Sequence, residues 1–118
     1  MTLKELYLAL DANYEEALMK MNADELIKRG VFRFRDTNPY QEMMDAYGAH
    51  DVVRLYEATH SMKEILGELA LSKLLETANN ICEVSRNMNI FDEESLGSLV
   101  QSFEREYQQT IAFINELD

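Results

Sequence analysis

One proline and four glycines are the only strong helix breakers in the 118 residues of this chain. Their scarcity favours an all-α protein, because most other residue types are tolerated inside helices. A single cysteine, Cys82, leaves no partner for an internal disulfide and excludes a metal site built from several cysteines. No apolar run approaches the roughly 20 residues that span a bilayer. The acidic, interrupted N-terminal segment is also unlike a signal peptide.

Positive charge is scarce as well. The chain has 11 Lys and Arg residues against 22 Asp and Glu residues, which gives a net charge of −11. This balance argues against binding to nucleic acid or to anionic membrane surfaces. Hydrophobic residues make up 47% of the sequence, which is enough for a single ordinary core. We therefore expect one soluble, cytoplasmic domain over residues 1–118 without a cofactor.

Helix-start signals and apolar residues at helical spacing divide the chain into seven expected helices. These helices cover residues 3–10, 14–21, 23–36, 39–47, 51–69, 72–88 and 93–116. The predicted capping residues are Thr2, Asn22, Asn38, Asp51, Ser72 and Asp92. Short connections favour antiparallel neighbours. We predict an antiparallel four-helix bundle with additional short N-terminal helices, in which 23–36, 51–69, 72–88 and 93–116 are the bundle helices.

The segment THSMKEILGELA, residues 59–70, contains a histidine that does not follow the apolar pattern. At roughly 100° per residue, the apolar side chains of this helix cluster in one direction, and His60 lies roughly 160° away from it. The apolar stripe consists of Leu55, Ala58, Met62, Leu66 and Leu69. The outward face is predicted to hold Val53, Tyr56, His60, Glu64 and Gly67, with Lys63 at its border. His60 is therefore expected to be exposed.

An exposed His60 has three candidate roles. Glu57 and His60 form a Glu-x-x-His pair, but the other histidine, His50, lacks the matching glutamate, so a di-metal bundle site is not predicted. An ordinary solvated histidine and a phosphorylatable nucleophile remain open. Neutral imidazole is a good nucleophile near pH 7, and Lys63 at i+3 can place an ammonium beside a phosphoryl group. Gly67 either admits a flat partner or only allows close helix packing.

These residues resemble the histidine-containing phosphotransfer (HPt) domain family of bacterial phosphorelays. The family pattern has Lys at +3 from the histidine, Gly at +4, small residues to +7, Leu-Gly near +9 and +10, and Leu at +14. The positions that fit this spacing are His60, Met62, Lys63, Gly67, Leu69, Ala70 and Leu74. The segment ANYEEALMKMNADELIKRGVFRF also resembles the opening helices of the family.

The resemblance implies a phosphocarrier that is not itself an enzyme. His60 would accept a phosphoryl group from a receiver-domain aspartate and pass it to another receiver, while the receiver supplies the metal ion and most catalytic groups. The implied partners are response-regulator receiver domains and a hybrid histidine kinase. Lys63 would stabilise the phosphoryl charge, and Arg86 falls where some members place a helper base. Exposed apolar patches often mark docking sites, so the outward face with Val53, Tyr56, Glu64 and Gly67 is the predicted partner surface.

Two residues depart from the family pattern. Glu64 stands at +4, where glycine is usual, and its carboxylate is expected to repel a phosphoryl dianion and favour the non-nucleophilic imidazolium. On this reasoning Glu64→Gly should speed transfer. Cys82 stands at +22, where several members carry a glutamine, and it cannot make the same hydrogen bonds. An alternative function follows from Glu64: an HPt-like binding module that docks on a receiver or kinase without being phosphorylated.

Overall fold

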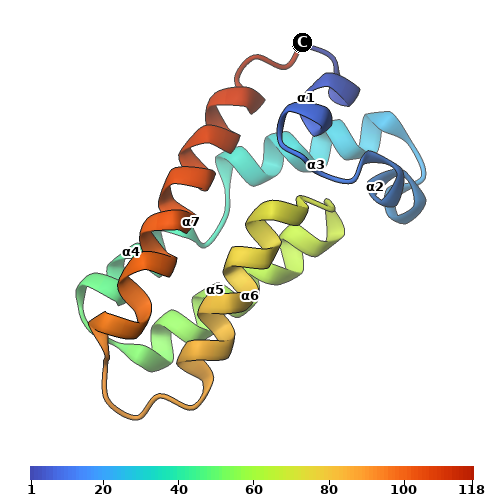
Figure 1. The fold of residues 1–118 in the computed structure, drawn as a ribbon. Coiled ribbons are helices and arrows are strands. Elements are labelled where there is room, and N and C mark those ends of the chain that lie inside the picture. The colour runs from blue at the N-terminus through green and yellow to red at the C-terminus, as the bar shows by residue number, and fades with distance from the viewer.

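The computed structural model describes all 118 residues, and every regular element in it is an α-helix (Figure 1). The helices are α1 (Leu3–Ala9), α2 (Tyr14–Met21), α3 (Asp24–Asp36), α4 (Tyr40–Gly48), α5 (Val52–Glu68), α6 (Ser72–Arg86) and α7 (Glu93–Ile114). The predicted all-α class is confirmed. Each predicted helix is present, with both ends within two residues of those expected.

The most extensive contacts join consecutive helices, namely α5 with α6, α4 with α5, and α6 with α7. Along the chain from α4 to α7, each helix runs in the direction opposite to its neighbour, so that α5, α6 and α7 each reverse the direction of the preceding helix (Figure 1). Their inner faces are apolar, and burying them is the main favourable contribution to folding. Fully buried side chains of this core include Met43, Leu55, Met62, Leu66, Ile81, Leu96 and Phe103. The same arrangement leaves the opposite face of α5 uncovered.

The place of α3 differs from the prediction. The prediction makes residues 23–36 one of the four bundle helices, but α4 packs along α5, and α3 packs mainly on α2 and α7. The helix breaks between α3 and α4 because a residue before proline disfavours the helical conformation, which stops α3 ahead of Asn38-Pro39. Where α3 meets the end of α5, Gly30 provides the space. A Cβ at Gly30 would lie 2.9 Å from Leu69 Cδ2.

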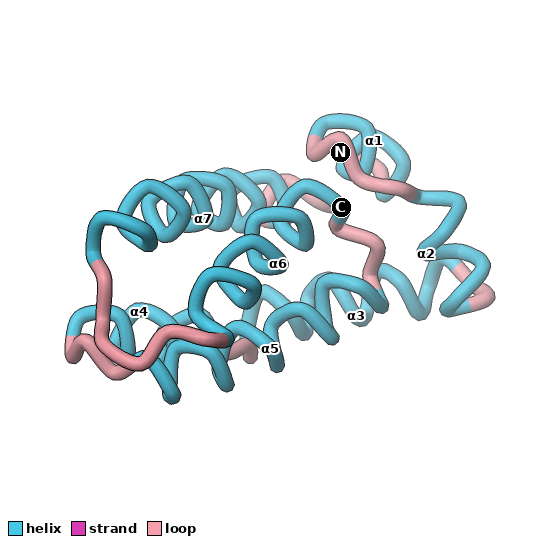
Figure 2. The backbone as a smooth tube through the Cα atoms, turned by 60° about the horizontal axis from the view of Figure 1, so that its bottom comes forward, coloured by secondary structure: helices cyan, strands magenta, loops and turns pink.

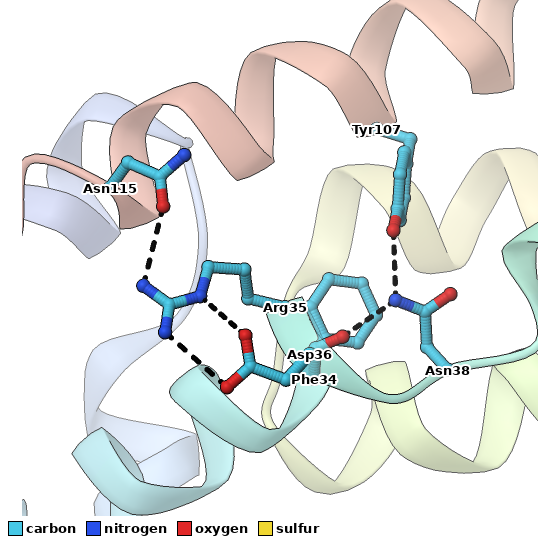
Figure 3. Close-up of polar contacts among 6 residues, drawn as sticks. All are labelled: Phe34, Arg35, Asp36, Asn38, Tyr107 and Asn115. Carbon is cyan, nitrogen blue, oxygen red and sulfur yellow. Dashed lines mark hydrogen bonds and ion pairs between the residues drawn. The ribbon is translucent and has the colours of Figure 1, made fainter.

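Asn38, in the break between α3 and α4, joins three helices, and Figure 3 shows its bonds to Phe34 of α3 and to Tyr107 of α7. Its Nδ2 donates to the Phe34 carbonyl oxygen at 2.6 Å and to the Tyr107 hydroxyl oxygen at 2.8 Å. Its Oδ1 accepts a hydrogen bond from the backbone N–H of Tyr40, the first residue of α4, at 2.7 Å. One side chain thus connects the end of α3, the start of α4 and the middle of α7.

We expect Asn38→Ala to lower the free energy of unfolding by about 2 kcal/mol, because it removes three hydrogen bonds that contribute roughly 0.5–1.5 kcal/mol each. Chemical denaturation monitored by circular dichroism measures the change. Asn89→Ala is a suitable control, since Asn89 is exposed and its side chain makes no hydrogen bond within the protein. Equal stability of the two variants would contradict the role assigned to Asn38.

The N-terminal helices close the end of the molecule where the two termini meet (Figure 2). The Met1 ammonium lies 3.2 Å from Asp118 Oδ1. The Tyr7 hydroxyl donates to the Leu69 carbonyl oxygen at 2.6 Å, and the Asn13 N–H donates to the Ala70 carbonyl oxygen at 3.0 Å. Burial raises the pKa of Tyr7. These bonds hold the turn between α5 and α6, and therefore the C-terminal end of the helix that carries His60.

Helix starts agree with the prediction in part. The predicted N-caps that are confirmed by side-chain bonds to the following backbone are Thr2, Asp51 and Asp92. The capping role predicted for Asn22 is wrong, because Asn22 ends α2 with φ 70°, a left-handed conformation that asparagine tolerates. Ser72 is wrong as a cap as well, since Leu71 occupies the N-cap without a side-chain bond. At α4 the N-cap is Pro39.

Candidate functional site

His60 lies at the middle of α5 on its outer face. The buried residues of this helix are Leu55, Ala58, Thr59, Met62 and Leu66, all on the side that faces α4 and α6. The His60 side chain is 51% exposed. The outward direction predicted from helical geometry is therefore confirmed. A ring in this position can be reached by another macromolecule without any movement of the fold.

The two ring nitrogens of His60 have different surroundings. Nδ1 lies 3.3 Å from Oε1 of Glu64, one turn further along the helix. Nε2 makes no hydrogen bond within the protein. On the N-terminal side, the Tyr56 ring lies 6.0 Å from the imidazole between centroids. The imidazole is thus flanked along the helix by a carboxylate and by an aromatic ring, and Nε2 is the nitrogen that stays open to a partner.

The two cationic residues predicted for the site differ in availability. Lys63 is half-buried and has no carboxylate within ion-pair distance, so its ammonium is free to act on a bound anion. Arg86 is held by Glu83, with Nη2 and Oε1 3.0 Å apart. The neighbouring Tyr56 hydroxyl, together with Glu83, raises the pKa of Arg86. Arg86 is therefore a permanently charged and occupied side chain, which does not suit the role of a base.

Cys82, on α6, lies close to Lys63 and Arg86, the two cationic residues predicted for the site. The side chain is fully buried, and burial raises the pKa of its thiol, although the nearby charges of Lys63 and Arg86 act in the opposite direction. A buried neutral thiol behaves as a small hydrophobic group. Cys82 thus lies buried on α6 near Lys63 and Arg86 and contributes no hydrogen-bonding group to the surface.

Gly67 lies two turns beyond His60, and its surroundings decide between its two possible roles. A Cβ added at Gly67 would meet no atom within 4 Å, so close helix packing does not require a glycine here. Its carbonyl oxygen accepts a hydrogen bond from Lys20 Nζ at 2.9 Å. The open space above Gly67 leaves a flat approach along α5 towards His60.

We expect Gly67→Ala to raise the free energy of unfolding by about 0.5–1 kcal/mol, because alanine has the higher helix propensity and its methyl group meets open space. Thermal or chemical denaturation measures the change. Gly30→Ala is the matched comparison and should stabilise the protein less than Gly67→Ala, since its Cβ would lie 2.9 Å from Leu69 Cδ2 and the end of that side chain would have to shift. Destabilisation by both substitutions would mean that Gly67 has a packing role after all.

The outward face continues beyond α5 onto a loop that the sequence did not single out. Val53 is 67% exposed and lines a shallow depression with Met88 and Phe91 from the segment between α6 and α7. The His50 ring stacks on Phe91 at 4.1 Å between centroids. Ile90, in the same loop, is 83% exposed. The only sequence signal for this extension is the adjacent apolar pair Ile90-Phe91 between two helices.

No three His, Cys, Asp or Glu side chains gather in a way that could hold a metal ion. None of the helices combines the length and the apolar character needed to cross a membrane. Comparisons with protein-family models, with curated proteins and with solved structures found no match for this chain. The geometry around His60 is therefore the principal ground on which a function can be argued.

Proposed function

We propose that this protein is an HPt-type phosphorelay intermediate that carries a phosphoryl group on His60 between receiver domains. The observation that supports this proposal best is the combination of a half-exposed imidazole, with Nε2 free of protein partners, and the unpaired Lys63 ammonium one turn away. Phosphoryl transfer depends mainly on positioning and on stabilisation of charge. A nucleophile and a cation on one open helix face supply both of these.

In the proposed reaction, Nε2 of His60 attacks the phosphorus of an aspartyl phosphate on a response-regulator receiver. An N–P bond forms, the bond between phosphorus and the aspartate oxygen breaks, and the aspartate carboxylate is regenerated. Lys63 offsets the negative charge of the phosphoryl group while it is held on the ring. The protein itself acts as a carrier, and the receiver contributes the metal ion and most catalytic groups. Transfer to a second receiver is the reverse of these steps.

For this role we infer that α4, α5, α6 and α7 act as an antiparallel four-helix bundle, with α1–α3 as additional helices at one end. Such a bundle holds α5 between α4 and α6, and this packing fixes the direction of His60. The site of action would be the cytoplasm, and a hybrid histidine kinase would be a further partner. The partner surface would be the outward face of α5 with Val53, Tyr56 and Gly67, extended by Ile90.

A second candidate function is a binding module that docks on a receiver or kinase without being phosphorylated. The Glu64 carboxylate, 3.3 Å from His60 Nδ1, favours this alternative because its charge opposes that of an incoming phosphoryl group. The exposed apolar residues Val53 and Ile90 would serve docking equally well in either case.

Incubation with phosphorylated receiver domains tests the proposal. We expect label to move onto this protein and to be lost in acid but retained in base, as is typical of phosphohistidine. A panel of receivers is needed, because specificity between partners rests on surface charge. Binding to a receiver without transfer of label would favour the docking module, and the absence of both binding and transfer would contradict both functions.

A further inference from the structure

The contact between Glu64 and His60 involves one particular nitrogen of the ring. Glu64 Oε1 lies 3.3 Å from Nδ1, which is slightly longer than the ordinary N–H···O hydrogen bond of about 2.7–3.2 Å. The Glu64 side chain is 72% exposed, so other side chains do not fix its position relative to the imidazole. Hydrogen bonds at reactive groups are often long in a free protein and shorten when the partner binds. The i, i+4 spacing places the two side chains at neighbouring positions on the helix surface.

We propose that Glu64 is a positioning residue that holds the proton of His60 on Nδ1 and thereby makes Nε2 the phosphoryl-accepting nitrogen. This inference rests on the proposed function and deepens it. In a neutral imidazole one nitrogen carries the proton and the other carries the lone pair, and the hydrogen bond made by one nitrogen sets the state of the other. A carboxylate beside Nδ1 therefore directs the lone pair to Nε2.

The chemistry of the transfer step gives Glu64 a second effect that also favours transfer to Nε2. When Nε2 attacks phosphorus, the N–P bond uses the ring lone pair and the Nδ1 proton stays in place, so the imidazole ring gains positive charge. The Glu64 carboxylate lies next to that charge and stabilises it. When the phosphoryl group leaves for the next aspartate, the bonding electron pair returns to Nε2, and the ring is again neutral and correctly protonated.

The sequence pattern predicts repulsion between the Glu64 carboxylate and the phosphoryl group. This repulsion acts over a longer distance than the contact between Glu64 and Nδ1 of His60. The phosphoryl group on Nε2 projects from the side of the ring away from Nδ1, and the mostly exposed carboxylate is screened by water and salt. The effect on the ring, in contrast, acts at contact distance. The geometry therefore favours positioning as the larger effect, which is opposite to the faster transfer expected for Glu64→Gly from sequence alone.

Nitrogen-15 NMR of the histidine rings tests the inference without any phosphate. Above neutral pH, the His60 ring of the natural protein should be protonated mainly on Nδ1. In Glu64→Ala the proton should move towards Nε2, and Glu64→Gln, which keeps an oxygen acceptor, should be intermediate. The chain has only two histidines, so His50 provides an internal reference. An unchanged His60 tautomer in Glu64→Ala would overturn the inference.

Glu57→Ala is the matched control, because it removes an equal negative charge from the same helix, one turn before His60. Glu57 is exposed and makes no contact with Nδ1 of His60. The substitution should leave the tautomer unchanged, and an equal shift would show that only charge matters. Transfer from a phosphorylated receiver should slow roughly two- to fivefold in Glu64→Ala and less in Glu64→Gln. Faster transfer in both would instead favour repulsion. If no variant accepts phosphate while the tautomer responds as expected, the phosphorelay function fails, and only the part of the proposal that places the His60 proton on Nδ1 stands.

Discussion

Substitution of His60 with glutamine is expected to abolish the acid-labile phosphorylation of this protein completely. Glutamine is close in size and remains polar, but its amide nitrogen has no available lone pair for attack on phosphorus. The substitution lies on an exposed helix face, where it removes no core packing. Transfer of label from a phosphorylated receiver, followed by treatment with acid, measures the loss.

The same variant should still bind the receiver with nearly unchanged affinity, because the imidazole supplies the chemistry while the wider face supplies most of the contact area. Titration by NMR, with shifts mapped onto the surface, checks this. His50→Gln is the matched control and should be phosphorylated normally, since His50 is stacked on Phe91. Acid-labile label that persists in the His60 variant and disappears in the His50 variant would move the site to the other histidine.

The second large effect concerns stability. Leu66→Ala should lower the free energy of unfolding by about 2–5 kcal/mol, because Leu66 is completely buried on the inner stripe of α5 and its truncation leaves a cavity. This loss is a large share of the roughly 5–15 kcal/mol that stabilises a typical domain. Denaturation by urea, monitored by circular dichroism, measures it.

Ser61→Ala on the same helix provides the control, since Ser61 is exposed and should change stability by less than about 0.5 kcal/mol. If Leu66→Ala remains folded at low temperature, its His60 should still accept phosphate, because residue 66 supports the helix and does not contact the reacting atoms. A stability of the Leu66 variant equal to that of the Ser61 variant would contradict the assignment of the inner face of α5.

The sequence by itself determined the helices and the direction of His60. Helix ends depend on local signals, such as the Asp51 and Asp92 caps, and these operate over four or five residues. The exposure of His60 follows from helical geometry, because the apolar stripe of α5 fixes which side faces the core. Both properties depend on residues close together along the chain, so the sequence alone predicts them.

Only the tertiary structure decided how the helices are placed and what each side chain meets. Periodicity marks the apolar face of α3 but does not indicate which helix that face packs against. The sequence therefore does not predict that α4, and not α3, packs along α5. The pairing of Arg86 with Glu83, the space above Gly67 and the contribution of Ile90 depend on rotamers and on segments that meet through folding. For Glu64 the spacing gave proximity to His60, but the approach to Nδ1 depends on side-chain torsions, which spacing does not encode.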